Sequence, residues 1–162
     1  MSDYINKIIT LILIFIMLVI GPLTFSYLSD ELTSQRMILN EVTEFLDKIT
    51  DPHNFGAIIR TANACDDFYL AINSYGIVLD AKVERYMQTP SIGVDGNMEN
   101  IYFMANDFSD LKSDEQMQLF AGDVIKVTVE EVSVSPGRRL MYYVLKVDSG
   151  KYNLSMSATV SR

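Results

Sequence analysis

The sequence predicts an α+β protein in which a long N-terminal helix carries a small head. An apolar run comes first, apolar residues at helical spacing follow, and the pattern then changes to the alternation typical of β-strands. We expect the head to combine an antiparallel sheet of about four strands with one to three short helices. The predicted organisation is an N-terminal membrane anchor (residues 1–29), an amphipathic stalk helix (30–51) and an α+β head (52–162).

The apolar run from Ile8 to Leu28 is long enough to cross a lipid bilayer. As a helix its 21 residues span about 31 Å, the thickness of a hydrocarbon core. Lys7 precedes the run and Asp30 follows it, which predicts a single-pass protein of the cell membrane with a cytoplasmic N-terminus and an extracytoplasmic head. The candidate anchor residues, which face the lipid bilayer, are Ile8, Leu11, Phe15, Leu18, Pro22 and Leu28.

Two other interpretations compete with a retained anchor. The apolar core Ile8–Ile20 has the length of a signal-peptide core, and Thr24-Phe25-Ser26 is a loose cleavage site. The run is also compatible with a buried core helix. A retained anchor is favoured because only one lysine precedes the run and Tyr27-Leu28 prolongs it beyond the cleavage site. Gly21-Pro22 is tolerated there, since a membrane helix accommodates a proline kink.

The stalk continues the helical pattern to about residue 49. Its apolar positions follow alternating spacings of four and three, with one polar member: Leu28, Leu32, Gln35, Leu39, Val42, Leu46 and Ile49. Such a seam packs either on a partner helix or on the chain's own head. Three heptads are marginal for a free coiled coil, so we expect packing on the head. Thr50-Asp51-Pro52 should end the helix.

The head begins irregularly, and a short helix around Asp66–Tyr75 should end at Gly76. Alternation then predicts strands at 76–87, 101–104, 124–134 and 151–160, with a loop or hairpin tip at 89–100. In the third strand the apolar parity slips at Glu130-Glu131, which predicts a β-bulge.

Residues 135–147 follow this strand and leave two alternatives open. Ser135-Pro136-Gly137 has the pattern of a helix start, and Leu140, Tyr143, Val144 and Val147 lie at helical spacing. A strand remains the alternative. Arg138 and Arg139 are the candidate partner surface, and we expect one of them to form an exposed pair with Glu130 or Glu131.

Composition argues against several functions. The net charge of −8 disfavours nucleic acid as a partner, because an acidic surface repels phosphates. His53 and Cys65, each the single residue of its type, cannot supply the three protein ligands of a zinc site. We expect Cys65 to be a buried, unreactive thiol. The acidic group Asp107, Asp110, Asp114 and Glu115 fits a solvated loop better than a cation site. We therefore predict no catalytic residue, no metal, no cofactor and no enzymatic activity.

Several motifs together resemble a known group of proteins. They are "LNEVTEFLDKIT" (39–50), "DFYLAINSYG" (67–76), "GDVIKVTVEEVSVSPGRRL" (122–140) and "LKVDSGKYNLSMSATV" (145–160). With the preceding anchor, the chain resembles the small single-span proteins of Gram-positive bacteria associated with Tad-type (tight-adherence) pilus assembly, that is, TadE/TadF-like minor pseudopilins.

This resemblance implies a non-enzymatic minor pilin or pseudopilin-like subunit, or an assembly factor, of a Tad-type, type IV-like pilus. Its partners would be other pilus or envelope subunits, and a helix-mediated oligomer is one expected assembly. The chain departs from the family pattern because Lys7 precedes the apolar run and no glutamate lies within Ile8–Leu28, so a prepilin-peptidase site is not evident. The alternative function is a membrane-tethered extracytoplasmic binding or sensing domain.

Overall fold

The structure is a computed structural model that describes residues 2–51, 61–108, 119–135, 138–139, 142–143, 146 and 150–161. The chain divides into two compact units. Unit 1 comprises Met1–Arg36 and Val134–Gly150, and unit 2 comprises Met37–Ser133 and Lys151–Arg162.

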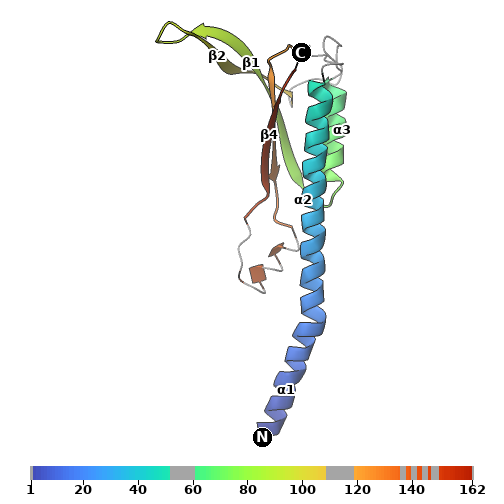
Figure 1. Ribbon diagram of the computed structural model, residues 1–162. Helices are drawn as coiled ribbons and strands as arrows, with labels where there is room; N and C mark the ends of the chain where they lie inside the picture. Colours follow the sequence, from blue (N-terminus) through green and yellow to red (C-terminus); the bar gives the residue numbers. More distant parts are fainter. Residues whose placement is uncertain are drawn as a thin grey trace. The chain divides into compact units, whose positions relative to one another are not determined.

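Helical backbone runs without interruption from Ser2 to Thr50, as the sequence predicts. It consists of α1 (Ser2–Phe15), the π-helical turn η1 (Ile16–Ile20) and α2 (Gly21–Thr50) (Figure 1). The helix ends before Asp51-Pro52 because a residue that precedes proline is sterically disfavoured in helical conformation.

The π-helical turn has a cause in the sequence. Pro22 has no N–H to donate, and its ring would clash with the carbonyl four residues earlier in a regular α-helix. The helix widens by one residue in this turn instead, so that the Gly21 N–H donates to the Ile16 carbonyl five residues back. The Thr24 hydroxyl lies 2.6 Å from the Ile20 oxygen and 2.9 Å from the Gly21 oxygen. The distortion expected at Gly21-Pro22 is thus a widened turn in which the Thr24 hydroxyl bonds two of the backbone carbonyls.

Unit 2 contains α3 (Thr61–Asn73) and a four-stranded antiparallel sheet, which confirms the α+β fold. The strands are β1 (Leu79–Ile92), β2 (Met98–Asp107), β3 (Val124–Glu131) and β4 (Asn153–Thr159), in the order β2-β1-β3-β4. A tight turn joins β1 to β2, in which the Gly93 N–H donates to the Asn97 oxygen at 2.8 Å and Gly96 takes a φ of 76°. A left-handed φ of this kind favours glycine.

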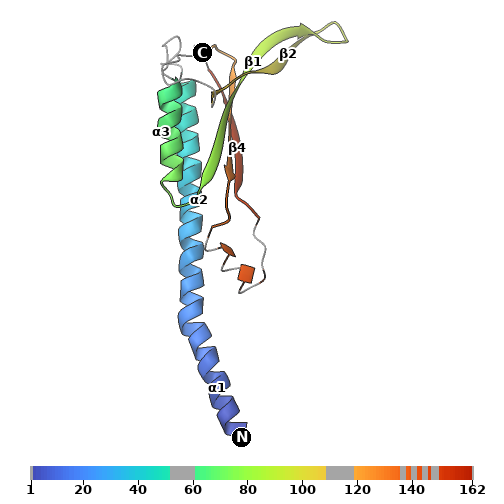
Figure 2. The same ribbon diagram turned by 180° about the vertical axis from the view of Figure 1, so that it is seen from behind.

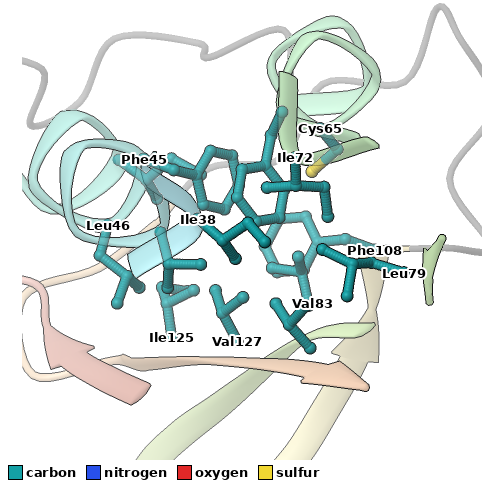
Figure 3. Packing of buried hydrophobic residues seen from close by; sticks show 14 of the residues in the cluster. Ile38, Phe45, Leu46, Cys65, Ile72, Leu79, Val83, Phe108, Ile125 and Val127 are labelled. Atoms are coloured by element: carbon teal, nitrogen blue, oxygen red, sulfur yellow. The ribbon is translucent and has the colours of Figure 1, made fainter. Parts of the chain in front are cut away.

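The core of unit 2 lies between the helices and one face of the sheet (Figure 3). Phe45 of α2 and Phe68 of α3 stack with ring centroids 4.3 Å apart. The sheet contributes alternate residues of its central strands, as the period of two requires. The largest fully buried side chains are Ile38, Ile72, Ile125, Val42, Val83, Val127, Val129 and Cys65.

The structure corrects the predicted heptad seam. Val42, Leu46 and Ile49 are buried as expected, but Leu28, Leu32 and Leu39 are exposed. Ile38 and Phe45 occupy the buried face instead. A straight helix repeats every 3.6 residues, so a stripe buried along one side of it drifts away from a strict heptad. Within unit 2 the helix therefore packs on its own head.

The predicted β-bulge at Glu130-Glu131 is wrong. β3 pairs with β1 in regular register as far as Leu79 opposite Glu131. Glu131 stays on the buried face, where its carboxylate accepts the Tyr152 N–H at 2.8 Å, and the strand ends there. The register shift lies instead between β1 and β2, where Ala105 is the extra residue opposite the step from Arg85 to Tyr86.

Other elements differ in length from the prediction. α3 begins at Thr61 and ends at Asn73, earlier than expected, and Gly76 has a φ of 78° in the connection that follows. β1 and β2 extend through most of the predicted hairpin loop, which leaves a turn of only a few residues. His53, and Asp110, Asp114 and Glu115 of the acidic group, lie outside the described residues.

Candidate membrane anchor and surface sites

The apolar part of the long helix has no protein packed over it. Ile8, Leu11, Phe15, Leu18 and Leu28 are between 39% and 71% exposed, and Pro22 is exposed as well. No residue in the most apolar 18-residue window of the helix Asp3–Thr50 is buried. Large apolar surfaces of this kind mark contact with lipid or with other helices. By length and composition this is the one helix, among the described residues, that can cross a membrane, which is compatible with a single-pass membrane protein.

The two threonine hydroxyls within this span are satisfied by the helix itself. The Thr10 hydroxyl donates to the Asn6 carbonyl at 2.8 Å, and the Thr24 hydroxyl contacts the carbonyls beside the π-helical turn. In a bilayer core no water is present to hydrogen-bond these hydroxyls, so such internal bonds lower the cost of transfer into lipid. The local structure of this span therefore suits an apolar environment.

An ion pair links Arg138 to Glu31 of the long helix. The Arg138 guanidinium forms an ion pair with the Glu31 carboxylate through Nε and donates from Nη1 to the Gly150 oxygen at 2.6 Å. The Ser135 hydroxyl donates to the other Glu31 oxygen at 3.1 Å. Both charged side chains are less than a tenth exposed, which strengthens the pair because solvent screens it little. These contacts attach Ser135 and Arg138 to α2 within unit 1 and link Gly150 to Arg138.

The placement of Arg138 corrects one part of the predicted partner surface. Its buried guanidinium is occupied by Glu31, so Arg138 is not displayed to a partner as the sequence led us to expect. Arg139 is exposed and remains a candidate for that role. The pairing of an arginine with Glu130 or Glu131 stays a prediction.

The helical alternative for residues 138–147 agrees with four of the five described residues, whereas Lys146 is not helical and has a φ of 55°. Residues 138–139 and 142–143 are helical, and the Arg139 N–H donates to the Ser135 carbonyl at 3.0 Å. The Ser135 hydroxyl accepts the Arg138 N–H at 3.3 Å, as the predicted N-cap requires. Pro136, Gly137, Leu140, Val144 and Val147 lie outside the described residues.

Two tyrosines and two cations are exposed along this segment. The rings of Tyr142 and Tyr143 meet edge to face with centroids 5.9 Å apart, and the Lys146 ammonium lies 5.8 Å from the Tyr142 centroid. Both rings are at least half exposed, and Arg139 and Lys146 are exposed too. We call Arg139, Tyr142, Tyr143 and Lys146 the Tyr/cation patch. Of these four, the sequence singled out only Arg139 as a surface site.

A second buried ion pair, between Arg85 and Asp123, stabilises unit 2. Arg85 donates from Nε at 2.9 Å and from Nη2 at 2.5 Å to one Asp123 oxygen, which also accepts the Phe120 N–H at 2.9 Å. The Arg85 guanidinium lies 5.7 Å from the Phe120 ring centroid. The pair thereby fixes the turn at residues 120–123 against β1. The sequence did not reveal this pair, because its members lie 38 residues apart.

Reactive chemistry finds little support in the part of the chain that the structure describes. Burial, and then the neighbouring Asp66 carboxylate, raise the pKa of the Cys65 thiol to about 12, so it stays protonated and is a poor nucleophile at neutral pH. Burial likewise raises the pKa of Tyr69. No group of three or more His, Cys, Asp or Glu side chains that could hold a metal ion occurs among the described residues.

A shallow groove runs between α2 and α3, with a volume of about 160 Å³. Phe45 and Phe68 lie at this groove, and Glu41, Glu44 and Asp67 give it an acidic lining. Small-molecule pockets usually enclose roughly 300–1,000 Å³. The groove is therefore too small for a typical ligand or cofactor.

The β1–β2 hairpin presents a second exposed apolar surface. β3 pairs with β1 only as far as Tyr86, so residues 87–103 form a two-stranded ribbon with its turn, which we call the hairpin arm (Figure 2). Apolar side chains are exposed on both of its faces, and no lysine or arginine occurs between residues 86 and 106. The large exposed apolar residues of the arm are Ile92, Val94, Met98, Ile101, Tyr102 and Phe103.

Comparisons with known proteins find no family model, no curated protein and no solved structure that matches this chain. The functional argument therefore depends on the exposed apolar helix, the Tyr/cation patch and the hairpin arm.

Proposed function

We propose that the chain is a non-enzymatic, single-pass envelope subunit of pilin-like build, anchored by residues 8–28 and displaying unit 2 outside the cell membrane. One observation carries the proposal. A single helix has an apolar first half in which no residue is buried and a second half that belongs to the core of a folded domain. Such a helix can pack laterally with other apolar helices in lipid while it displays its domain. The Tad-type pilus is the system that the sequence motifs suggest.

Two further features support a structural role over catalysis. The only cysteine is buried and protonated, and the acidic unit 2 holds 17 of the 21 acidic but only 8 of the 13 basic residues. An acidic domain is repelled by the anionic surface of a membrane, which suits a domain held away from it. The expected topology has Lys7 on the cytoplasmic side.

Exchange of the anchor tests the proposal. Residues 1–29 are replaced by an unrelated membrane anchor of equal length joined in helical phase at Asp30, so that Glu31 and its contacts with Arg138 are kept. A subunit that packs through its apolar helix should insert normally yet fail to restore filament assembly in a deletion strain. A second chimera restores the native residues 8–28 and keeps the foreign residues that flank them. This chimera should recover assembly. Full assembly with the foreign anchor contradicts the proposal.

A membrane-tethered binding domain is the second candidate, and the hairpin arm favours it. Isolated two-stranded ribbons are marginally stable in water, and exposed apolar residues on both faces suit an interaction surface. For this function the chain should still bind its partner with the foreign anchor, while the double substitution Ile101→Ser and Phe103→Ser should abolish that binding. Leu70→Ser with Val132→Ser is the matched control, because both side chains are exposed outside the arm.

A further inference from the structure

We propose that the Tyr/cation patch binds anionic phospholipid headgroups and holds residues 135–150 at the membrane surface. The inference rests on the proposed membrane anchor. It assigns a lipid-binding role to a segment far from the anchor in sequence. Placement, side-chain chemistry and charge each support it.

Placement comes from the ion pair between Arg138 and Glu31. Glu31 lies three residues after Leu28, the last residue of the apolar run, and three residues of helix rise about 4.5 Å. The segment that begins at Ser135 is therefore attached to α2 at the level where the hydrocarbon core gives way to headgroups. Arg138, Ser135 and Gly150 all contribute to this attachment, and all belong to unit 1.

The side chains of the patch suit the lipid–water boundary. Tyrosine is enriched at membrane interfaces because its ring is apolar and its hydroxyl is polar. Tyr142 and Tyr143 are exposed neighbours that meet edge to face, and the Lys146 ammonium lies against the Tyr142 ring. Arg139 adds a second exposed cation. Rings and cations together match the layered chemistry of acyl chains and phosphates.

Charge favours anionic headgroups as the occupant of this patch. Residues 134–150 carry three basic side chains and one acidic one, Asp148, and Arg138 is already neutralised by Glu31. Arg139 and Lys146 remain together with Asp148, a net charge of +1, in contrast to the net charge of −9 that the sequence assigns to unit 2. Each lysine or arginine near an anionic surface raises the equilibrium constant for membrane binding about fivefold.

Fluorescence quenching in nanodiscs tests this contact, because the native chain contains no tryptophan. The full chain with Tyr143→Trp is placed in discs of phosphatidylcholine alone or mixed equally with phosphatidylglycerol. The acyl chains are brominated either near the headgroup or near their ends. Leu13→Trp reports the anchor, and Tyr102→Trp in the hairpin arm is a comparison position outside unit 1.

Headgroup-proximal bromine should quench the indole at position 143, and more strongly in the anionic discs. Arg139→Ala with Lys146→Ala should lower the docked-to-free ratio about 25-fold in those discs, since each cation contributes about fivefold. Lys126→Ala with Lys151→Ala removes the same charge from unit 2 and should leave quenching at position 143 unchanged. Circular dichroism of each variant confirms that the chain is folded.

Several outcomes would overturn the inference. Quenching at position 13 without quenching at position 143 would show that the anchor lies in lipid but that the Tyr/cation patch does not contact headgroups. Equal quenching at position 143 in neutral and anionic discs, unchanged by the charge substitutions, would show that the patch does not prefer anionic headgroups. A photocross-linker at position 143 that captures a protein in cells while lipid quenching is absent makes the patch a protein interface. Absence of quenching at position 13 would instead refute the anchor itself.

Discussion

The two halves of the long helix are both helical but have opposite surroundings. From Ile8 to Leu28 large apolar side chains are exposed all around the helix, whereas from Ile38 to Ile49 they form one buried stripe. A helix that is apolar all round suits lipid, and one with an apolar stripe suits a protein core. Helical structure alone therefore does not identify the environment, but the distribution of apolar residues around the helix does.

The largest effect is expected from a charge placed in the core of unit 2. Val127 is fully buried in the centre of β3, and Val127→Asp would bury a carboxylate without a partner. We expect unit 2 to unfold while residues 8–28 still insert into membranes. Thr128→Asp, on the opposite face of the same strand, is the control. Loss of near-ultraviolet circular dichroism in detergent reports the unfolding, and retention of that signal would contradict the core assignment.

Neighbouring residues of α2 allow the buried stripe to be tested directly. Ile38 is fully buried and Leu39 is 40% exposed. Ile38→Ala should lower the free energy of unfolding of unit 2 by about 2–5 kcal/mol, because a cavity remains. Leu39→Ala should change it by less than about 0.5 kcal/mol. Urea titration of both variants measures the difference, and similar losses would restore the predicted heptad seam.

A charge in the exposed half should affect insertion but not folding. An arginine at the bilayer centre costs roughly 2.5–3.5 kcal/mol on insertion scales. Leu13→Arg should therefore reduce the carbonate-resistant fraction, while the urea midpoint of unit 2 remains unchanged. Insertion is measured by fractionation together with protease protection. A variant that loses the fold of unit 2 instead would show that the two halves are not independent.

The two adjacent arginines should differ because only one is buried. Arg138→Ala leaves the buried Glu31 carboxylate with the Ser135 hydroxyl but without its cation, and the loss of a hydrogen bond to a charged group costs about 1.5–3 kcal/mol. We expect hydrogen exchange to accelerate in residues 135–150 and not in the sheet. Arg139→Ala should leave exchange unchanged. Equal exchange in the two variants would indicate that the ion pair does not hold the segment.

The smallest effect concerns the Cys65 thiol and appears only at alkaline pH. Its pKa is about 12 in the folded protein, against about 8.5 for an exposed thiol. The unfolded chain thus loses this proton first, so the thiol makes unit 2 less stable as pH rises from about 8.5 to about 12. Cys65→Ala should reduce this alkaline loss. At pH 8 iodoacetamide should label Cys65 slowly until urea unfolds unit 2, and rapid labelling of the native protein would contradict the burial.

The local elements were predictable from the sequence because their signals are local. Length and apolarity identified the helix across Ile8–Leu28, and proline after Asp51 fixed its end. Alternation identified the inward residues of β4, and the Asp95-Gly96 pair identified the hairpin turn. Each of these signals comes from the backbone preferences of a few consecutive residues, which sequence periodicity reports directly.

Tertiary structure decided the contacts between residues that are distant in the chain. Glu31 and Arg138 are 107 residues apart, and neither has a sequence pattern that names the other. Glu131 continues the buried face because Tyr152 offers a backbone N–H there, although the pattern of valines suggested a bulge. Ile38 and Phe45 are buried instead of Leu39 because the sheet and α3 determine which face of α2 loses water. Such pairings depend on proximity in the folded chain, and the pattern of residues along the sequence does not report which distant residues lie close together.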